Sequence, residues 1–413
     1  MFVSSGDFVN ESGKSASKAM AFFGQEKVEF NAKLCTMNMA VHGLNAKIVS
    51  GEGANSFYND AHNLEGKCDY VMANPPFNVN KVNYENAQNA GRLPFGLPGY
   101  NEKTKEIGNA NYLWISYFYS YLNEKGRAGF VMASSATDSQ HADKEIRSKL
   151  IDTGHVDVIL SVGNNFFYTL SLPCTLWFFD KGKKAELKDK VLFIDARNYF
   201  TVIDRNLNEW TSWQIKNLSS IVHLYRGETE KYAAVINEYC TYFHEVSQQF
   251  NGREMAFTLG NCKESKDFAD VKNAVEKEIA NILEEQKQTE AEFERKADEA
   301  AKAGNKKAAN EAKRQKKAAL QLLEGLQNDV NEILTVAKDA CWLAEKFGDG
   351  VYADVAGLCK IATKAEIAEK NCSLTPGAYV GVTEVQEEDE NFEERMKEIH
   401  AELNKLQSES DDL

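Results

Sequence analysis

Short apolar runs alternate with longer helical patterns between residues 20 and 195 of the chain. Runs rich in β-branched and aromatic residues predict strands, and apolar residues three and four apart predict helices between them. This alternation is typical of βαβ units around a largely parallel sheet. The predicted strands are 21–24, 46–50, 70–73, 128–133, 156–161, 174–179 and 191–194, and the predicted helices are 29–42, 112–123 and 143–153.

The stretch 78–111 interrupts this pattern. It is rich in Asn, Gly and Pro and has no apolar period, which predicts a long loop. Loops of this length within a compact domain are usually functional.

The pattern becomes mostly helical after Trp213. Two stretches with apolar residues three and four apart predict antiparallel helices that are joined near Gly304. The basic run 306–317 is interpreted as a solvated helix face rather than as a DNA-contacting face. A last predicted helix follows an acidic linker at 387–390, and its isolated apolar stripe indicates a partner surface. That stripe consists of Phe392, Met396, Ile399, Leu403 and Leu406.

Composition narrows the class of protein. The chain has 413 residues, of which 43% are hydrophobic, enough for a sizeable core with a second domain or helical appendage. Its net charge of −14 argues against tight nucleic-acid binding by the isolated chain. The eight cysteines lack metal-ligand spacing, so we expect reduced thiols and no metal site. No stretch is typical of a signal peptide or a membrane span, and we expect a cytoplasmic protein.

Four residues directly after the predicted strand 70–73 carry candidate chemistry: Asn74, Pro75, Pro76 and Phe77. In open parallel sheets, ligands bind beyond the carboxyl ends of strands, where Asn74 would lie. The side-chain amide of Asn74 and the main-chain carbonyl of Pro75 can each accept a hydrogen bond, and Phe77 offers a ring face. A rigid strand-to-loop turn that uses Asn and Pro is the less favoured alternative.

With these four residues the chain resembles the amino-group DNA methyltransferases. Further stretches narrow the resemblance to the modification (methyltransferase) subunits of type I restriction-modification systems. These stretches are GQE at 24–26, LCTMNMAVHGL at 34–44, YLWISYFYSYLNEKGRAGFVM at 112–132, LPCTLWFFDKG at 172–182 and SLTPGAYVGV at 373–382. The resemblance implies an α/β fold, with a Rossmann-like methyltransferase sheet in 1–212, a helical region in 213–385 and a partner-binding helix in 386–413.

The implied reaction is the transfer of a methyl group from S-adenosylmethionine to N6 of an adenine that is flipped out of DNA. The base must leave the helix stack, and its amino lone pair must be aimed at the donor. Asn74 and Pro75 would accept the two N–H bonds, and Pro76 would help to hold the Pro75 carbonyl rigidly. Phe77 would stack on the base.

The resemblance also implies binding roles outside the tetrapeptide. Glu26 would bind the ribose hydroxyls of S-adenosylmethionine, Asn55 would contact its adenine, and Asn74 would complete the cofactor site. Phe167 would stack on the flipped base from the side opposite Phe77. The alternative for Glu26 is a surface residue that complements a helix dipole. The alternative for Phe167 is an ordinary aromatic residue of the core.

The implied partners are DNA, a specificity subunit, a restriction subunit and a second copy of the modification subunit. No membrane is implied as a partner. Because the chain is acidic, we expect a partner to hold the DNA. RNA or protein methylation is less favoured, because 373–382 is similar to type I subunits in particular.

The family's acidic, glycine-rich turn for the methionine part of the cofactor has no counterpart here. Phe2, Val3, Phe8 and Val9 already have helical spacing, which predicts that the chain begins inside an element, without the first strand of the sheet. Two explanations stay open: an internal methionine was taken as the start of a longer gene, or the gene product is truncated. We expect weak or no S-adenosylmethionine binding by this chain. The alternative function is a catalytically incompetent remnant that acts only as an interaction module for the specificity subunit.

Overall fold

The computed structural model describes residues 1–169, 171–382 and 396. Residues Met1–Val380 form one compact unit, and Gly381–Leu413 are assigned to a second. The predicted last helix and most of its apolar stripe lie outside the described residues. In the described part of the chain, no helix is both long and apolar enough to cross a membrane.

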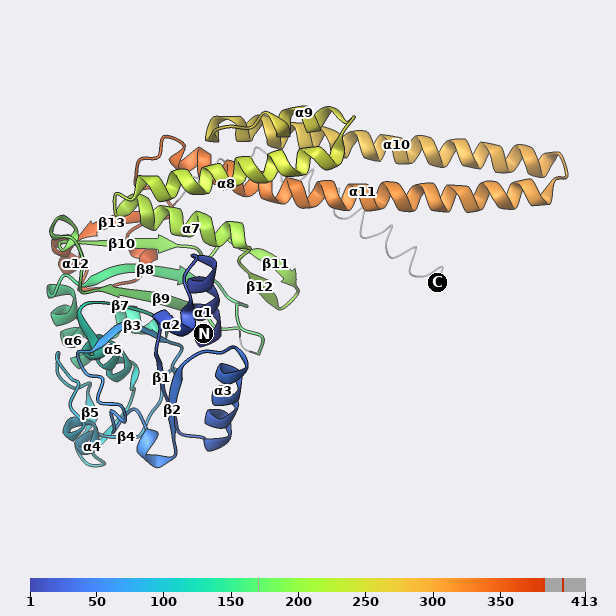
Figure 1. Ribbon diagram of the computed structural model, residues 1–413. Coiled ribbons are helices and arrows are strands. Elements are labelled where there is room, and N and C mark those ends of the chain that lie inside the picture. The colour runs from blue at the N-terminus through green and yellow to red at the C-terminus, as the bar shows by residue number, and fades with distance from the viewer. Residues whose placement is uncertain (170, 383–395, 397–413) are drawn as a thin grey trace. The chain divides into compact units, whose positions relative to one another are not determined.

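A six-stranded sheet with the order β13-β10-β8-β9-β7-β3 forms the centre of the first unit (Figure 1). The strands β3, β7, β8 and β10 run in one direction and β9 and β13 run in the other, so the predicted α/β fold is confirmed, with a mixed sheet in place of the largely parallel one. The reason is that β9 inserts between β7 and β8 and runs antiparallel to both. The strands are β3 (Cys68–Ala73), β7 (Leu122–Ala133), β8 (Val156–Val162), β9 (Cys174–Asp180), β10 (Lys190–Asp195) and β13 (Cys359–Thr363).

The first two strands form a separate sheet. β1 (Phe22–Glu26) and β2 (Ala46–Ser50) pair in parallel with each other only. β3 is the edge strand of the six-stranded sheet, and on its open side no strand of the described residues pairs with it. Tyr70 and Met72 of β3 are 70% and 53% exposed, unusual values for aromatic and apolar residues of a strand. The single sheet predicted from the sequence is therefore two sheets: β1 and β2 form the smaller one, and β3 is the edge strand of the larger one.

Helices cover both faces of the six-stranded sheet. One core cluster joins the sheet to α5, α6 and α12, and every residue of β8 is buried between this cluster and the one on the opposite face. Around β1 and β2, α1 confirms the helix predicted at the start of the chain, and its Phe2 ring lies 5.1 Å from that of Phe22. These helices are α1 (Phe2–Glu11), α2 (Ala16–Ala19), α3 (Glu29–Val41), α5 (Asn111–Tyr121), α6 (Ala142–Asp152) and α12 (Lys364–Glu369).

The stretch 78–111 folds into a small subdomain, so the prediction of a loop without elements is partly wrong. Its core contains Val82, Ala87 and Ile107, which are all at most 3% exposed. These apolar residues are too isolated in the sequence to produce a period, which is why the pattern predicts a loop. The elements are β4 (Val82–Asn83), α4 (Tyr84–Asn89), β5 (Tyr100–Asn101) and β6 (Glu106–Ile107).

The helical region packs on the second face of the sheet. The predicted antiparallel pair is confirmed by α10 and α11, which are joined at Gly304 with φ +72° (Figure 1). β11 and β12 form a hairpin before α7, whose first turn is fixed by a capping box between Thr211 and Gln214. The elements are β11 (Thr201–Asp204), β12 (Leu207–Glu209), α7 (Ser212–Tyr225), α8 (Thr229–Ser247), α9 (Glu254–Gly260), α10 (Phe268–Lys302) and α11 (Lys306–Phe347).

Six short 3₁₀ turns complete the described elements. They are Glu52–Ala54, Ser134–Asp138, Ala185–Leu187, Gln248–Phe250, Ser265–Asp267 and Pro376–Ala378.

Candidate functional site

The tetrapeptide predicted to carry chemistry begins directly after β3, at the carboxyl end of that strand. Asn74 is exposed, and its side-chain amide has no hydrogen-bond partner among the residues that the structure describes. Pro75 is buried, Pro76 is exposed and Phe77 is half-buried. The main chain is therefore anchored at Pro75 while the amide of Asn74 is free to meet a ligand.

The two predicted base-stacking residues lie side by side. The rings of Phe77 and Phe167 have centroids 6.5 Å apart and cross at 76°, although 90 residues separate them in sequence. Both rings also pack against the main core cluster, which is the contact expected of ordinary core aromatics. The loop of Phe167 is held by Asn208, whose backbone N–H donates to the carbonyl of Asn165 at 2.8 Å.

Three asparagines that the sequence analysis did not single out fix the turn after Phe77. Asn78 has φ +53°, a left-handed conformation that Asn tolerates better than most residues. Its backbone N–H donates to Oδ1 of Asn111 at 2.9 Å, and Nδ2 of Asn111 donates to Oδ1 of Asn78 at 2.9 Å. Nδ2 of Asn109 donates to the same Asn78 oxygen at 3.0 Å. The only sequence signal was their position at the two ends of the stretch 78–111.

The predicted cofactor residues lie on the smaller sheet. Glu26 is the last residue of β1, and its Oε1 accepts a hydrogen bond from the backbone N–H of Val28 at 2.8 Å. Asn55 follows a short turn after β2, and its Oδ1 accepts from the backbone N–H of Phe57 at 3.1 Å. Within the described residues, no hydrogen bond or ring contact joins either residue to the tetrapeptide.

Gln25 connects the two predicted cofactor residues. Its Nε2 donates to the carbonyls of Ala54 and Asn59 at 3.3 and 3.1 Å, on either side of Asn55. Its Oε1 accepts from the backbone N–H of Ala61 at 3.1 Å. Gln25 therefore holds the Asn55 loop against the end of β1, a positioning role that its place in the GQE stretch alone did not reveal.

The Asn55 loop is also anchored to the subdomain and to α5. Arg92, which is 3% exposed, donates to the carbonyl of Ser56 at 3.1 Å and to the hydroxyl of Tyr121 at 2.7 Å. The hydroxyl of Tyr117 donates to the carbonyl of Phe57 at 2.9 Å. Burial raises the pKa of Tyr117 to about 12.

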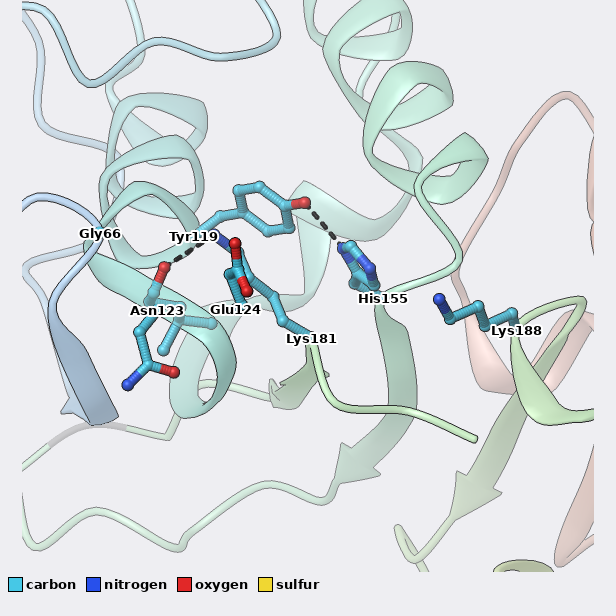
Figure 2. Close-up of a pocket in the computed structure, with 8 residues that line it drawn as sticks. Gly66, Tyr119, Asn123, Glu124, His155, Lys181 and Lys188 are labelled. Carbon is cyan, nitrogen blue, oxygen red and sulfur yellow. Dashed lines mark hydrogen bonds between the residues drawn. The ribbon is translucent and has the colours of Figure 1, made fainter. Parts of the chain in front are cut away.

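A pocket of about 520 Å³ is lined by other residues, among them Tyr119, His155 and Lys181 (Figure 2). It is located at the amino-terminal ends of β7 and β8, the opposite end of those strands from the edge where Asn74 follows β3. In this pocket Nδ1 of His155 is 2.7 Å from the hydroxyl of Tyr119. Burial and the charges of Lys188 and Lys181 lower the pKa of His155. The sequence predicts no role for this pocket, and it is not part of the candidate site.

Residues 1–247 match a family model described as N-6 DNA methylase. The match covers more than half of the chain, and the chain belongs to this family.

Curated relatives are methylase subunits of type I restriction enzymes. The MjaIX methylase subunit of Methanocaldococcus jannaschii is 33% identical over 217 residues, which are 51% of this chain and 37% of that protein. The HindI methylase subunit of Haemophilus influenzae is 29% identical over 208 residues, 50% of this chain and 44% of that protein. The chain thus spans less than half the length of these two relatives.

Solved structures include a type I restriction-modification methyltransferase subunit from Streptococcus thermophilus. It is 22% identical, covers 52% of this chain and 44% of its own, and has a TM-score of 0.46. A similarity of this size carries no weight for function.

Proposed function

We propose that this chain acts as the modification subunit of a type I restriction-modification complex and methylates N6 of adenine in DNA. One observation carries the proposal. Asn74 presents an exposed amide that has no hydrogen-bond partner in residues 1–169 and 171–382, at the carboxyl end of β3 and next to the buried Pro75. This is the edge of the sheet at which ligands of α/β proteins bind.

The free amide suits the chemistry of an exocyclic amine. The lone pair of that nitrogen is delocalised into the base, so it must be localised before it can attack a methyl group. Two acceptors, Oδ1 of Asn74 and the carbonyl of Pro75, would bind the two N–H groups and draw the nitrogen toward tetrahedral geometry. The N–CH₃ bond would form as the S–CH₃ bond of the donor breaks and leaves a thioether, and the methylated amine would then release one proton to water.

Phe77 and Phe167 would receive the base itself. A base between two parallel rings needs about 7 Å from ring plane to ring plane, twice the usual contact distance. The two rings are 6.5 Å apart and cross at 76°. Stacking on both sides therefore requires one ring to rotate, and the half-exposed loop of Phe167 is the side on which we expect this rotation.

The proposed methyl donor is S-adenosylmethionine, which supplies an electrophilic methyl group. On its adenosine side the residues present fit, whereas for its methionine side the sequence has no acidic, glycine-rich turn, so we expect binding by this chain alone to be weak. Glu26 uses only Oε1 in its bond to Val28, which leaves Oε2 to accept from ribose hydroxyls. Asn55 uses only Oδ1, which leaves its Nδ2 as a donor toward an adenine nitrogen. Gln25 holds the two in place.

The proposed partners follow from charge and from the relatives. A chain of net charge −14 repels the DNA backbone over most of its surface, so another subunit must contribute much of the DNA affinity. We propose that a specificity subunit does so, in a complex that also contains a restriction subunit and a second copy of this chain.

The test is methyl transfer to a DNA duplex by the chain purified with its specificity subunit, using radiolabelled S-adenosylmethionine. We expect Asn74→Ala to lower kcat by about 10²–10³, because one acceptor of the amine is lost, while DNA binding changes little. Asn80→Ala is the matched control, since Asn80 is an exposed asparagine on the same loop. Transfer that survives Asn74→Ala would refute the proposal, and a wild-type complex that binds DNA without transfer would favour the interaction-module alternative.

A further inference from the structure

The outer end of the α10–α11 hairpin concentrates positive charge. Between Arg295 and Lys317 the chain has nine basic and three acidic residues, a net charge of +6 in a chain whose total is −14. Taken alone, the run 306–317 predicts a solvated face. The hairpin changes this interpretation, because it brings basic residues from the end of α10 next to those at the start of α11 (Figure 1). We call residues 295–317 the basic tip.

Most of these cations are not neutralised within the protein. Lys296 pairs with Glu292, and Lys316 pairs with Glu290 and Glu294. The other seven are exposed and form no ion pair in the part of the chain that the structure describes. They are Arg295, Lys302, Lys306, Lys307, Lys313, Arg314 and Lys317.

The placement of four of the seven works against the stability of α11. Lys306 and Lys307 occupy the first turn of α11, which contains no acidic residue, and the helix dipole disfavours cations there. Lys313 and Lys317 are four residues apart on one helix, where like charges repel. Charges that destabilise their own element indicate an anionic partner outside it.

The basic tip presents charged and polar side chains and no large apolar side chain. Its largest apolar residue is alanine, and Ala297 and Ala312 are buried where the two helices pack together. Protein interfaces depend on aromatic and large aliphatic anchors, which the tip lacks. The tip also lies far from the core, since Lys306 is 24 residues from Val330, the nearest fully buried α11 residue of the main core cluster, or about 36 Å of helix.

We propose that the basic tip binds the phosphate backbone of duplex DNA, without reading its sequence. This inference rests on the proposed function, in which DNA is the substrate. A pair of helices is about 20 Å wide, whereas the major groove is about 12 Å wide, so the tip contacts phosphates and does not enter the groove. Because the rest of the chain has a net charge of −20, the tip is where contact with DNA is favourable.

The test measures binding of the full chain to a fluorescent DNA duplex by anisotropy over a series of salt concentrations. The tip variant carries K306Q, K307Q, K313Q and R314Q, since glutamine keeps helix propensity. We expect its affinity to fall by about tenfold or more and its log–log salt slope to decrease by about 2 to 4. A charge-preserving variant with K306R, K307R, K313R and R314K should bind like the wild type.

The matched control removes four exposed lysines elsewhere, by K231Q, K266Q, K287Q and K338Q, and reaches the same net charge. Equal losses in the tip and control variants would overturn the inference, as would a wild-type chain that binds no duplex at low salt. The inference would also be overturned if the tip variant lost binding to single-stranded RNA but kept the wild-type affinity for the DNA duplex. Binding is measured without a methyl donor, so the two proposals can fail separately. If the complex methylates DNA and the tip variant binds DNA like the wild type, this inference alone is refuted. If binding depends on the tip but no methylation occurs, the proposed function alone is refuted.

Discussion

Replacement of Asn111 by alanine tests how the turn after the tetrapeptide is held. The Asn111 side chain is 2% exposed and makes two hydrogen bonds to Asn78, one as acceptor and one as donor. Asn111→Ala removes both and leaves the backbone N–H of Asn78 without its partner. Each such bond contributes about 1 kcal/mol, and the loss of the acceptor for the part-buried N–H of Asn78 adds to this.

We therefore expect the free energy of unfolding to fall by about 2–3 kcal/mol, as measured by urea denaturation followed by circular dichroism. Asn101→Ala is the control. Oδ1 of Asn101 also accepts two hydrogen bonds, from the backbone N–H groups of Lys103 and Thr104, but this turn is exposed. Its effect should stay within about 0.5 kcal/mol.

The same substitution should slow methyl transfer, because Asn78 directly follows Phe77 and its left-handed turn would lose its support. We expect kcat to fall by about 10–100-fold, less than for Asn74→Ala, since the acceptors remain but are less well placed. An Asn111→Ala protein as stable as the Asn101→Ala control would show that the turn does not depend on this pair and would refute the argument.

Three further predictions concern other parts of the chain. Burial raises the pKa of Asp143 to about 6, so the native carboxyl keeps its proton to higher pH than the unfolded one, and its contribution to stability falls as pH rises from about 4 to 6. Asp143→Asn should therefore raise the free energy of unfolding by about 1–3 kcal/mol at pH 7 and leave it unchanged near pH 4; the opposite pH trend would contradict this. Deletion of residues 287–326 with a short glycine turn in their place should shift Tm by less than about 3 °C, because this part of the hairpin lies outside the main cluster except for Leu326. Phe167→Leu should raise KM for DNA while the fold stays intact by circular dichroism, and an unchanged KM would assign Phe167 to the core alone.

The local elements were predictable from the sequence because their signals are local. All seven predicted strands occur with end points within a few residues, apart from β7, which begins six residues earlier than expected. The position of Asn74 at a strand end was predictable for the same reason. The tetrapeptide follows a short apolar run, and period and length identify such runs.

The order of the strands was not predictable from these patterns. β9 has the same apolar character as β8, and nothing in its residues indicates that it turns back and inserts beside β7. β13 reaches the edge of the sheet more than 160 residues after β10, although the helices between them suggest a separate helical region. Pairing of distant strands depends on packing between faces, which a one-dimensional pattern does not contain.

The residues of the candidate site also differ in how far they could be predicted from the sequence. Asn74 and Phe77 could be found from a contiguous motif, whereas Asn78 and Asn111 act through a contact between residues 33 positions apart. Neither asparagine has a distinctive sequence context. Gln25 was visible only as part of the GQE stretch, and its bonds to the Asn55 loop depend on how β1 and that loop meet.

The open side of β3 has a consequence for the behaviour of the chain in solution. Along this side, the backbone N–H and C=O groups pair with no strand of the described residues, and Tyr70 and Met72 of the same strand are exposed, so another extended chain can align there. Natural sheets usually protect such edges with lysine, proline or a bulge. None of the six residues of β3 is lysine or proline, and its one register irregularity, between Cys68 and Tyr70, leaves the rest of the strand regular. Concentrated solutions of this chain should therefore self-associate through strand pairing, and a single lysine in place of Met72 should suppress it.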